Sequence, residues 1–198
     1  VELVSAVFER AGYETSMEFA PWQTVLKGMK QGKYDVLVAN WKTQKRQNML
    51  LFSEPYFTNK LVVISPDRMI DSTRDLNLIV QEKGAVLGLM SDYAYGKVLP
   101  EKAEVQRHQH YTPLLRKLAS GNLTATLMDQ CVANYQLHQL PNLESKLKVS
   151  THPIEHKPLH ISVLKNHPAS ATLIKDFNIA LKEYTASKQY KQLLKRYQ

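Results

Sequence analysis

Apolar residues recur at helical spacing in the first part of the chain. A first helix is predicted over residues 3–11, where the pattern stops at Gly12, and a second helix over residues 21–32. An extended segment is predicted over residues 13–19, between these two helices. Residues 34–39 are rich in apolar side chains, which predicts a buried parallel strand. The predicted order is therefore helix, strand, helix, strand.

The alternation of helices and strands continues to the end of the chain and predicts the α/β class. A chain that enters an α/β sheet through a helix implies a preceding strand, so the first strand of the fold is expected to be missing here. Further strands are predicted over residues 61–64, 86–90 and 123–128. Further helices are predicted from an entrance at 91–93, from a cap at 112–113 to residue 121, and over 173–184 and 190–197. Residues 150–160 are predicted to form an extended return segment.

One pattern occurs twice in the sequence. Residues 26–38 and residues 115–127 each contain the end of a helix, a glycine and a strand in the same register. Asn40 and Asp129 follow these strands at matching positions. Ligands of open parallel sheets lie beyond the carboxyl ends of the strands. The repeat therefore predicts two similar lobes, each with one polar candidate for ligand contact.

Composition narrows the class of protein further. The 198 residues carry 26 lysines and arginines against 18 acidic residues, a net charge of +8. The basic residues are spread along the chain and do not alternate with aromatic ones, so nucleic-acid binding is not predicted. The single cysteine, Cys131, excludes an internal disulfide. No apolar run approaches the roughly 18 residues of a membrane-spanning helix.

Several short motifs occur together in the first part of the chain. Trp22 opens a helix, and Gly-Lys-Tyr-Asp at residues 32–35 precedes a strand. Residues 43–46 read Thr-Gln-Lys-Arg, and residues 52–56 read Phe-Ser-Glu-Pro-Tyr. This pattern resembles the family 3 extracellular solute-binding proteins, the group that binds polar amino acids. Further agreement lies in residues 121–129, 165–168 and 177–181.

The resemblance implies an α/β, two-lobed, periplasmic-binding-protein-like fold of type II with a hinge. Lobe 1 would comprise residues 1–65 and 158–198, and lobe 2 residues 66–157. Ser65–Pro66 and Ile154–Pro158 are the hinge candidates. Such proteins close by hinge motion around a ligand held in the cleft between the lobes.

The resemblance also implies roles for three side chains. Arg46 matches the arginine that clamps a ligand carboxylate, which two parallel N–H donors of a guanidinium suit well; the alternative is an exposed, solvated arginine. Asp129 matches the acidic residue that binds an α-amino group, and it is also a candidate N-cap for the following helix. Trp22 matches the aromatic residue that packs on the ligand side chain, and its alternative is a core position at the helix entrance.

Other matching positions belong to turns near the expected cleft. Ser91 and Asp92 match the stretch in which lobe 2 offers a hydroxyl and backbone N–H groups at a helix N-terminus, the alternative being a plain cap. Thr43 is a candidate either to donate its hydroxyl to the ligand or to close the turn around Arg46.

The sequence departs from the family pattern between residues 35 and 43. Amino-acid binders usually carry serines there, whereas this chain has Asn40, Trp41 and Lys42 and is one residue shorter. Trp41 and Lys42 are expected to make the cleft bulkier and more cationic. The ligand is therefore expected to be an amino acid or a related small carboxylate, without a closer identification.

The three histidines at positions 152, 156 and 160 recur every four residues, but Pro153 and Pro158 interrupt the helix that would align them on a metal. They are interpreted as surface histidines, and no metal, cofactor or catalytic motif is predicted.

The resemblance implies extracytoplasmic, periplasmic binding of a small polar ligand for ABC-type uptake or signalling, with a membrane permease or receptor as partner and no enzymatic activity. One alternative is the ligand-sensing input domain of a membrane receptor. Another is a periplasmic dehydratase-like enzyme, for which Asp129 is the one candidate acid or base.

Overall fold

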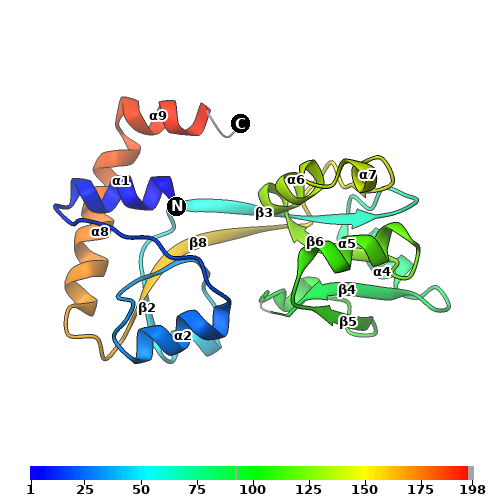
Figure 1. The fold of residues 1–198 in the computed structure, drawn as a ribbon, viewed down its shortest axis with the longest axis horizontal. Coiled ribbons are helices and arrows are strands. Elements are labelled where there is room, and N and C mark those ends of the chain that lie inside the picture. The colour runs from blue at the N-terminus through cyan, green and yellow to red at the C-terminus, as the bar shows by residue number, and fades with distance from the viewer. Residues whose placement is uncertain (92, 196–198) are drawn as a thin grey trace. The chain divides into compact units, whose positions relative to one another are not determined.

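The computed structural model describes residues 1–91 and 93–195. Contacts within the chain divide it into two compact units, one of Val1–Thr58 with Pro158–Gln198 and one of Asn59–Lys157 (Figure 1). The chain therefore leaves the first unit once, builds the second, and returns.

The first unit is built around strand β8, which pairs antiparallel with β1 on one edge and with β2 on the other. Ser162 is the shared position, since it lies opposite Leu37 of β1 and Phe52 of β2. The elements of this unit are α1 (Glu2–Arg10), α2 (Trp22–Lys30), β1 (Leu37–Trp41), α3 (Gln44–Gln47), β2 (Leu50–Phe52), most of β8 (Glu155–Leu164), α8 (Ser170–Thr185) and α9 (Lys188–Lys195).

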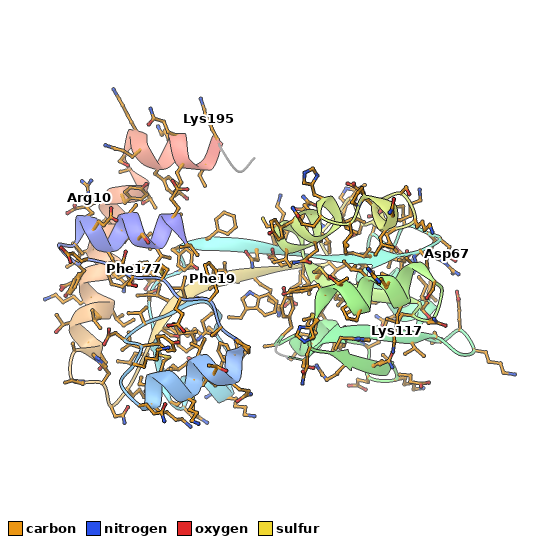
Figure 2. All side chains as sticks on the ribbon, in the orientation of Figure 1. Arg10, Phe19, Asp67, Lys117, Phe177 and Lys195 are labelled. Atoms are coloured by element: carbon orange, nitrogen blue, oxygen red, sulfur yellow. The ribbon has the colours of Figure 1, made fainter. Side chains whose placement is uncertain are left out.

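Helix α1 packs on α8 through its apolar face. Val4 and Val7 are fully buried, and the rings of Phe8 and Phe177 lie 5.0 Å apart. Arg10, labelled in Figure 2, lies at the end of α1 and forms an exposed ion pair of 3.1 Å with Glu183 of α8. Burial of the apolar face supplies most of the stability of this contact, because an exposed ion pair contributes little.

Strand β1 contains an irregularity at Ala39. The pairing with β8 shifts between Leu37 and Asn40, and Ala39 has a φ of 55°, in the left-handed region that favours glycine. The backbone N–H of Ala39 donates to the hydroxyl of Tyr56 at 3.0 Å. Burial raises the pKa of Tyr56 to about 12, so this hydroxyl stays protonated. Tyr56 therefore stabilises the strained backbone at Ala39. This backbone directs Asn40, the residue after Ala39, toward β8.

The second unit contains a mixed sheet in which β4 pairs parallel with both β5 and β6, and β6 pairs antiparallel with β3. The carboxyl ends of β4, β5 and β6 consequently lie at one edge of the sheet. The elements are β3 (Phe57–Ser65, most of it in this unit), α4 (Thr73–Ile79), β4 (Val86–Met90), the 3-10 helix η1 (Gly96–Val98), β5 (Glu104–His108), α5 (Tyr111–Ala119), β6 (Ala125–Asp129), α6 (Gln130–His138), α7 (Pro141–Glu144) and β7 (Lys148–Val149).

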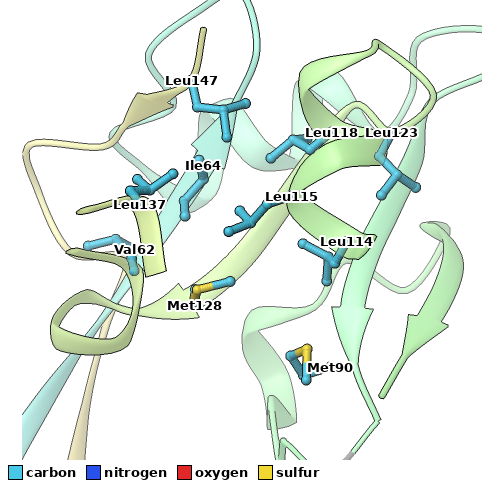
Figure 3. Close-up of a cluster of buried hydrophobic side chains, with 11 residues drawn as sticks. Val62, Ile64, Met90, Leu114, Leu115, Leu118, Leu123, Met128, Leu137 and Leu147 are labelled. Carbon is cyan, nitrogen blue, oxygen red and sulfur yellow. The ribbon is translucent and has the colours of Figure 1, made fainter. Parts of the chain in front are cut away.

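A cluster of buried side chains joins α5 to the sheet of the second unit (Figure 3). Leu114, Leu115 and Leu118 of α5 are each 0% exposed and contact strand residues such as Ile64 and Met128. The helical spacing of these leucines places all three on one face of α5, which explains why the sequence pattern located this helix.

The structure confirms the helices predicted near both ends of the chain and the strand at residues 86–90. The last helix is confirmed as far as Lys195, since the predicted residues 196 and 197 lie outside the described residues. It corrects the expected parallel strand at 34–39, because β1 begins at Leu37 and pairs antiparallel with β8. Residues 13–19 form no strand. Helix α5 begins at Tyr111 with His110 as N-cap, so Thr112 does not cap it.

The expected first boundary and first hinge candidate also differ from the structure. Strand β3 continues from Phe57 to Ser65, and residues 61–64 of it pair with β6. The division between units therefore falls at Thr58, and Ser65–Pro66 lies inside the second unit. Ile154–Pro158 includes the second crossing point. Independent motion of the two units remains a prediction.

We expect Leu115→Ala to lower the free energy of unfolding by about 2–5 kcal/mol, because it removes buried methyl groups and leaves a cavity. Leu78→Ala is the matched control, since Leu78 is 57% exposed, and its cost should stay below about 1 kcal/mol. Urea unfolding followed by circular dichroism measures both. Equal costs for the two variants would contradict the position assigned to the α5 core.

Candidate ligand-binding site

The loop after β1 folds into the short helix α3, which carries Arg46. Thr43 is the N-cap of α3, and its Oγ1 accepts a hydrogen bond from the backbone N–H of Arg46 at 3.2 Å. Of the two roles considered for Thr43, the structure shows the one that closes the turn. This cap fixes where the Arg46 side chain leaves the backbone.

Asn40, Trp41 and Trp22 of the first unit contact the guanidinium of Arg46. Its Nη1 donates to Oδ1 of Asn40 at 2.8 Å and to the carbonyl oxygen of Trp41 at 3.0 Å. Its Cζ lies 4.1 Å from the ring centroid of Trp22, a cation–π geometry. Arg46 is half-buried. It is therefore an anchored side chain rather than a solvated surface arginine.

Asn40 is fully buried and links Arg46 to the sheet. Its Nδ2 donates to Oγ of Ser162 at 2.7 Å, which leaves Oδ1 turned toward Arg46. Asn40 lies inside β1 rather than beyond its end, as the repeat had suggested. Ser162 was not predicted, because a serine in a strand carries no signal of its own.

The two tryptophans have different environments. Trp22 is half-buried and packs against Met29, Leu37 and Leu50 beneath Arg46. Trp41 is 8% exposed, so its bulk belongs to the interior rather than to an open site, which corrects the expectation for this residue. Lys42 is exposed.

His160 is buried, which corrects its interpretation as a surface histidine. Its Nδ1 lies 2.7 Å from the carbonyl oxygen of Ser53, and its ring meets Phe52 edge-on at 5.9 Å. Oγ of Ser53 accepts from the N–H of Ile161 at 3.1 Å. The Phe-Ser-Glu-Pro-Tyr motif thus fastens β2 to β8. His152 and His156 are exposed, and within residues 1–91 and 93–195 no group of His, Cys, Asp or Glu is arranged to hold a metal.

In the second unit, Asp129 ends β6 and is the N-cap of α6. Its Oδ1 accepts from the N–H of Val132 at 3.1 Å. The residue is 3% exposed, and its Oδ2 is buried with no hydrogen-bond partner in the described part of the chain. Burial raises the pKa of Asp129, while the amides of Val132 and Cys131 lower it by less. Oδ1 of Asp129 therefore caps α6, while Oδ2 has no hydrogen-bond partner among the described residues.

Polar and aromatic residues follow the carboxyl ends of the parallel strands β4 and β5. The hydroxyls of Tyr93 and Tyr111 lie 3.2 Å apart. The pKa of Tyr93 is raised, first by burial and then by Tyr111 and the charge of Asp129. The N–H and Oγ of Ser91 both donate to the carbonyl oxygen of His108, at 2.8 and 3.1 Å.

The helix entrance predicted at residues 91–93 is wrong for the residues described there. Ser91 lies in a turn, Tyr93 follows without helical structure, and the next helical turn is Gly96–Val98. The hydroxyl of Ser91 is engaged by His108, so it does not cap a helix. Asp92, the other candidate of this stretch, lies outside the described residues.

The mixed α/β architecture is that of the periplasmic binding proteins. The solved structure of an ancestral arginine-binding protein bound to glutamine matches it with a TM-score of 0.79 at 21% sequence identity, over 99% of this chain and 85% of that one. At this identity the likeness shows the fold alone. The chain belongs to the bacterial extracellular solute-binding proteins, family 3, whose family model matches residues 1–198.

Two relatives show how distant the sequence similarity is. A protein named "Probable histidine-binding protein" from Neisseria gonorrhoeae is 23% identical over 201 residues, which span all of this chain and 73% of that protein. The arginine-binding extracellular protein ArtP of Bacillus subtilis is 24% identical over 136 residues, 67% of this chain and 52% of ArtP. This chain therefore spans only about half of ArtP.

The lengths and hydropathies of the helices bear on membrane insertion. None of those within residues 1–91 and 93–195 is both long and apolar enough to cross a bilayer.

We expect the Asp129→Asn variant to be more stable than the wild type at pH 7. The pKa of Asp129 is raised above its ordinary 3.8, so the folded state binds this proton more tightly than the unfolded state. The free energy of unfolding then falls as the pH rises above 3.8 through the folded-state pKa. Asparagine keeps the capping oxygen and removes the buried charge.

Urea unfolding at a series of pH values tests this expectation. The stability difference between the Asp129→Asn variant and the wild type should be largest at neutral pH and should close as the pH falls toward 3.8, the ordinary value. Glu144→Gln, at an exposed position, controls for the loss of one negative charge. A difference that does not change with pH would show that burial does not shift this carboxyl group.

Proposed function

We propose that this protein binds a polar amino acid, using Arg46 for the α-carboxylate and Asp129 for the α-ammonium. The observation that carries the proposal is the anchored guanidinium of Arg46, which rests on Trp22 and is held by Asn40 and the Trp41 carbonyl. A planar guanidinium with a fixed orientation is suited to a carboxylate, whose two oxygens accept parallel N–H bonds.

Asp129 supplies the complementary chemistry. A buried carboxylate oxygen with no hydrogen-bond donor is unfavourable, and burial raises the pKa of this group. An ammonium group on the ligand would donate to Oδ2 and bring a compensating charge. This role leaves the bond between Oδ1 and the N–H of Val132 in place. The geometry of Asp129 therefore supports binding of a cationic group by a carboxylate that also caps α6.

The family and the names of the relatives support an amino acid as the ligand class. The two relatives are named for histidine and arginine binding, and both names place the amino acid as the bound solute. We infer an extracytoplasmic binding protein that delivers a polar amino acid to an ABC-type transporter. In this role the ligand is bound and released unchanged.

A thermal-shift screen of the twenty amino acids and small organic acids tests the ligand class. A ligand present at about 100 times its Kd stabilises the folded state by about 2.7 kcal/mol, which corresponds to a Tm increase of roughly 5–10 °C for a chain of this size. We expect this increase for one or a few polar amino acids. NMR of the ligand after incubation should show no product. An unchanged Tm with every amino acid would contradict the proposed ligand class.

Arg46→Ala should weaken binding of the amino acid found in the screen by roughly tenfold to a hundredfold, because a charge-assisted hydrogen bond contributes about 1.5–3 kcal/mol. Lys45→Ala is the matched control, since Lys45 carries the same charge on α3 and is exposed. Isothermal titration calorimetry measures both affinities. Equal weakening by the two variants would reduce the role of Arg46 to a general charge effect.

A further inference from the structure

We propose that Asn40 and Trp22 are positioning residues for Arg46: they hold its guanidinium in the orientation that binds a ligand carboxylate, and Trp22 does not pack on the ligand side chain. This inference rests on the proposed function, since it concerns the same half of the site. It assigns to Trp22 a role different from the one that the family resemblance implied.

The orientation of the Asn40 amide is set from the sheet side. Oγ of Ser162 accepts from Nδ2 of Asn40 at 2.7 Å, so the amide oxygen is the atom that meets Arg46, at 2.8 Å. Asn40 is 0% exposed, and the pairing register of β1 with β8 shifts at Ala39, just before it. A buried amide fixed in this way offers the arginine an acceptor that cannot turn away.

The Trp41 carbonyl provides the second acceptor, at 3.0 Å from the same Nη1. The two protons of Nη1 are therefore directed at two acceptors that both belong to the backbone or buried core of β1. Two hydrogen bonds from one nitrogen fix the plane of the guanidinium. A fixed plane lowers the entropy that is lost when a carboxylate binds.

The face of Trp22 is already covered. Cζ of Arg46 lies 4.1 Å from its ring centroid, and the indole also packs against Met29, Leu37 and Leu50. A ligand side chain that stacked on this face would have to displace the guanidinium that binds its own carboxylate. Trp22 therefore acts as a platform for Arg46.

Asn40, Trp41 and Trp22 contact the guanidinium through neutral groups: an amide oxygen, a backbone carbonyl and an aromatic ring. A carboxylate at position 40 would have nearly the same shape as the asparagine but would place a negative charge against Nη1 of Arg46. Asn40→Asp is accordingly the sharpest substitution for this inference.

The first experiment compares carboxylate with carboxamide ligands. Calorimetry gives the ratio of affinities for L-histidine over L-histidinamide and for L-arginine over L-argininamide. In the wild type we expect a ratio of at least roughly tenfold. Asn40→Asp should abolish this preference, and Trp22→Leu should reduce it several-fold, while the ranking of histidine against arginine stays the same. Asn48→Ala, at an exposed asparagine, should change neither quantity.

A changed ranking of the two amino acids in Trp22→Leu, with the carboxylate preference intact, would overturn the inference, because Trp22 would then contact the ligand side chain. An unchanged preference in Asn40→Asp would overturn it as well. If neither amino acid binds the wild type, the proposed function fails for these ligands, and a second measurement still decides the inference.

That second measurement needs no ligand. The arginine side-chain signals of Arg46 in ¹⁵N NMR are assigned by their loss in Arg46→Lys. Restrained rotation about the Nε–Cζ bond should keep its Nη signals separate in the wild type and average them in Asn40→Ala. Circular dichroism confirms that each variant is folded. Averaged signals in the wild type would show that Asn40 and Trp22 do not hold the guanidinium, whatever the ligand.

Discussion

The hydrogen bond from Arg46 to the buried amide of Asn40 depends on nearly every local feature of the first unit. Asn40 meets Arg46 because Ser162 of β8 binds the other end of its amide. Ser162 is in place because β8 pairs with β1 and β2. The register of β1 in turn changes at Ala39, whose backbone N–H donates a hydrogen bond to the hydroxyl of Tyr56. A binding group on a short surface helix is thus supported by the centre of a sheet.

The second unit carries a different kind of constraint. Asp129 is buried at the end of β6, and its capping bond uses only one of its two oxygens. A side chain chosen for stability alone would not bury a charge in this way. In the proposed function, a ligand ammonium offsets this cost when it binds to Asp129. The buried carboxylate then lowers the stability of the free protein and raises its affinity for the ligand. Such exchanges are common where a folded protein must recognise a charged molecule.

Sequence patterns located most helices because their apolar faces have a period that can be read within a dozen residues, as in α5 with Leu114, Leu115 and Leu118. The parallel or antiparallel direction of a strand could not be predicted from the sequence in the same way. Leu37 pairs with Ser162, and no local pattern specifies a partner so far along the chain. For the same reason the burial of His160 was missed, since its environment comes from Phe52 and Ser53.

In the candidate site, too, local sequence signals could be predicted and tertiary contacts could not. Arg46 and Asp129 were predicted from motifs and from the resemblance, and the structure gives each a defined environment. The contacts that orient them were not predicted, because they depend on tertiary neighbours. Ser162 has no distinctive sequence signal, and the stacking of Arg46 on Trp22 joins α3 to the start of α2.

A distance measurement shows whether the carboxylate of a bound amino acid pairs with Arg46. Solid-state NMR can detect the dipolar coupling between ¹⁵N-labelled arginine side chains and an amino acid labelled with ¹³C at its carboxylate, with Arg46→Lys as the reference. We expect a coupling that corresponds to about 4 Å or less and disappears in the variant. A tightly bound amino acid whose carboxylate shows no coupling to Arg46 would rule out this pairing.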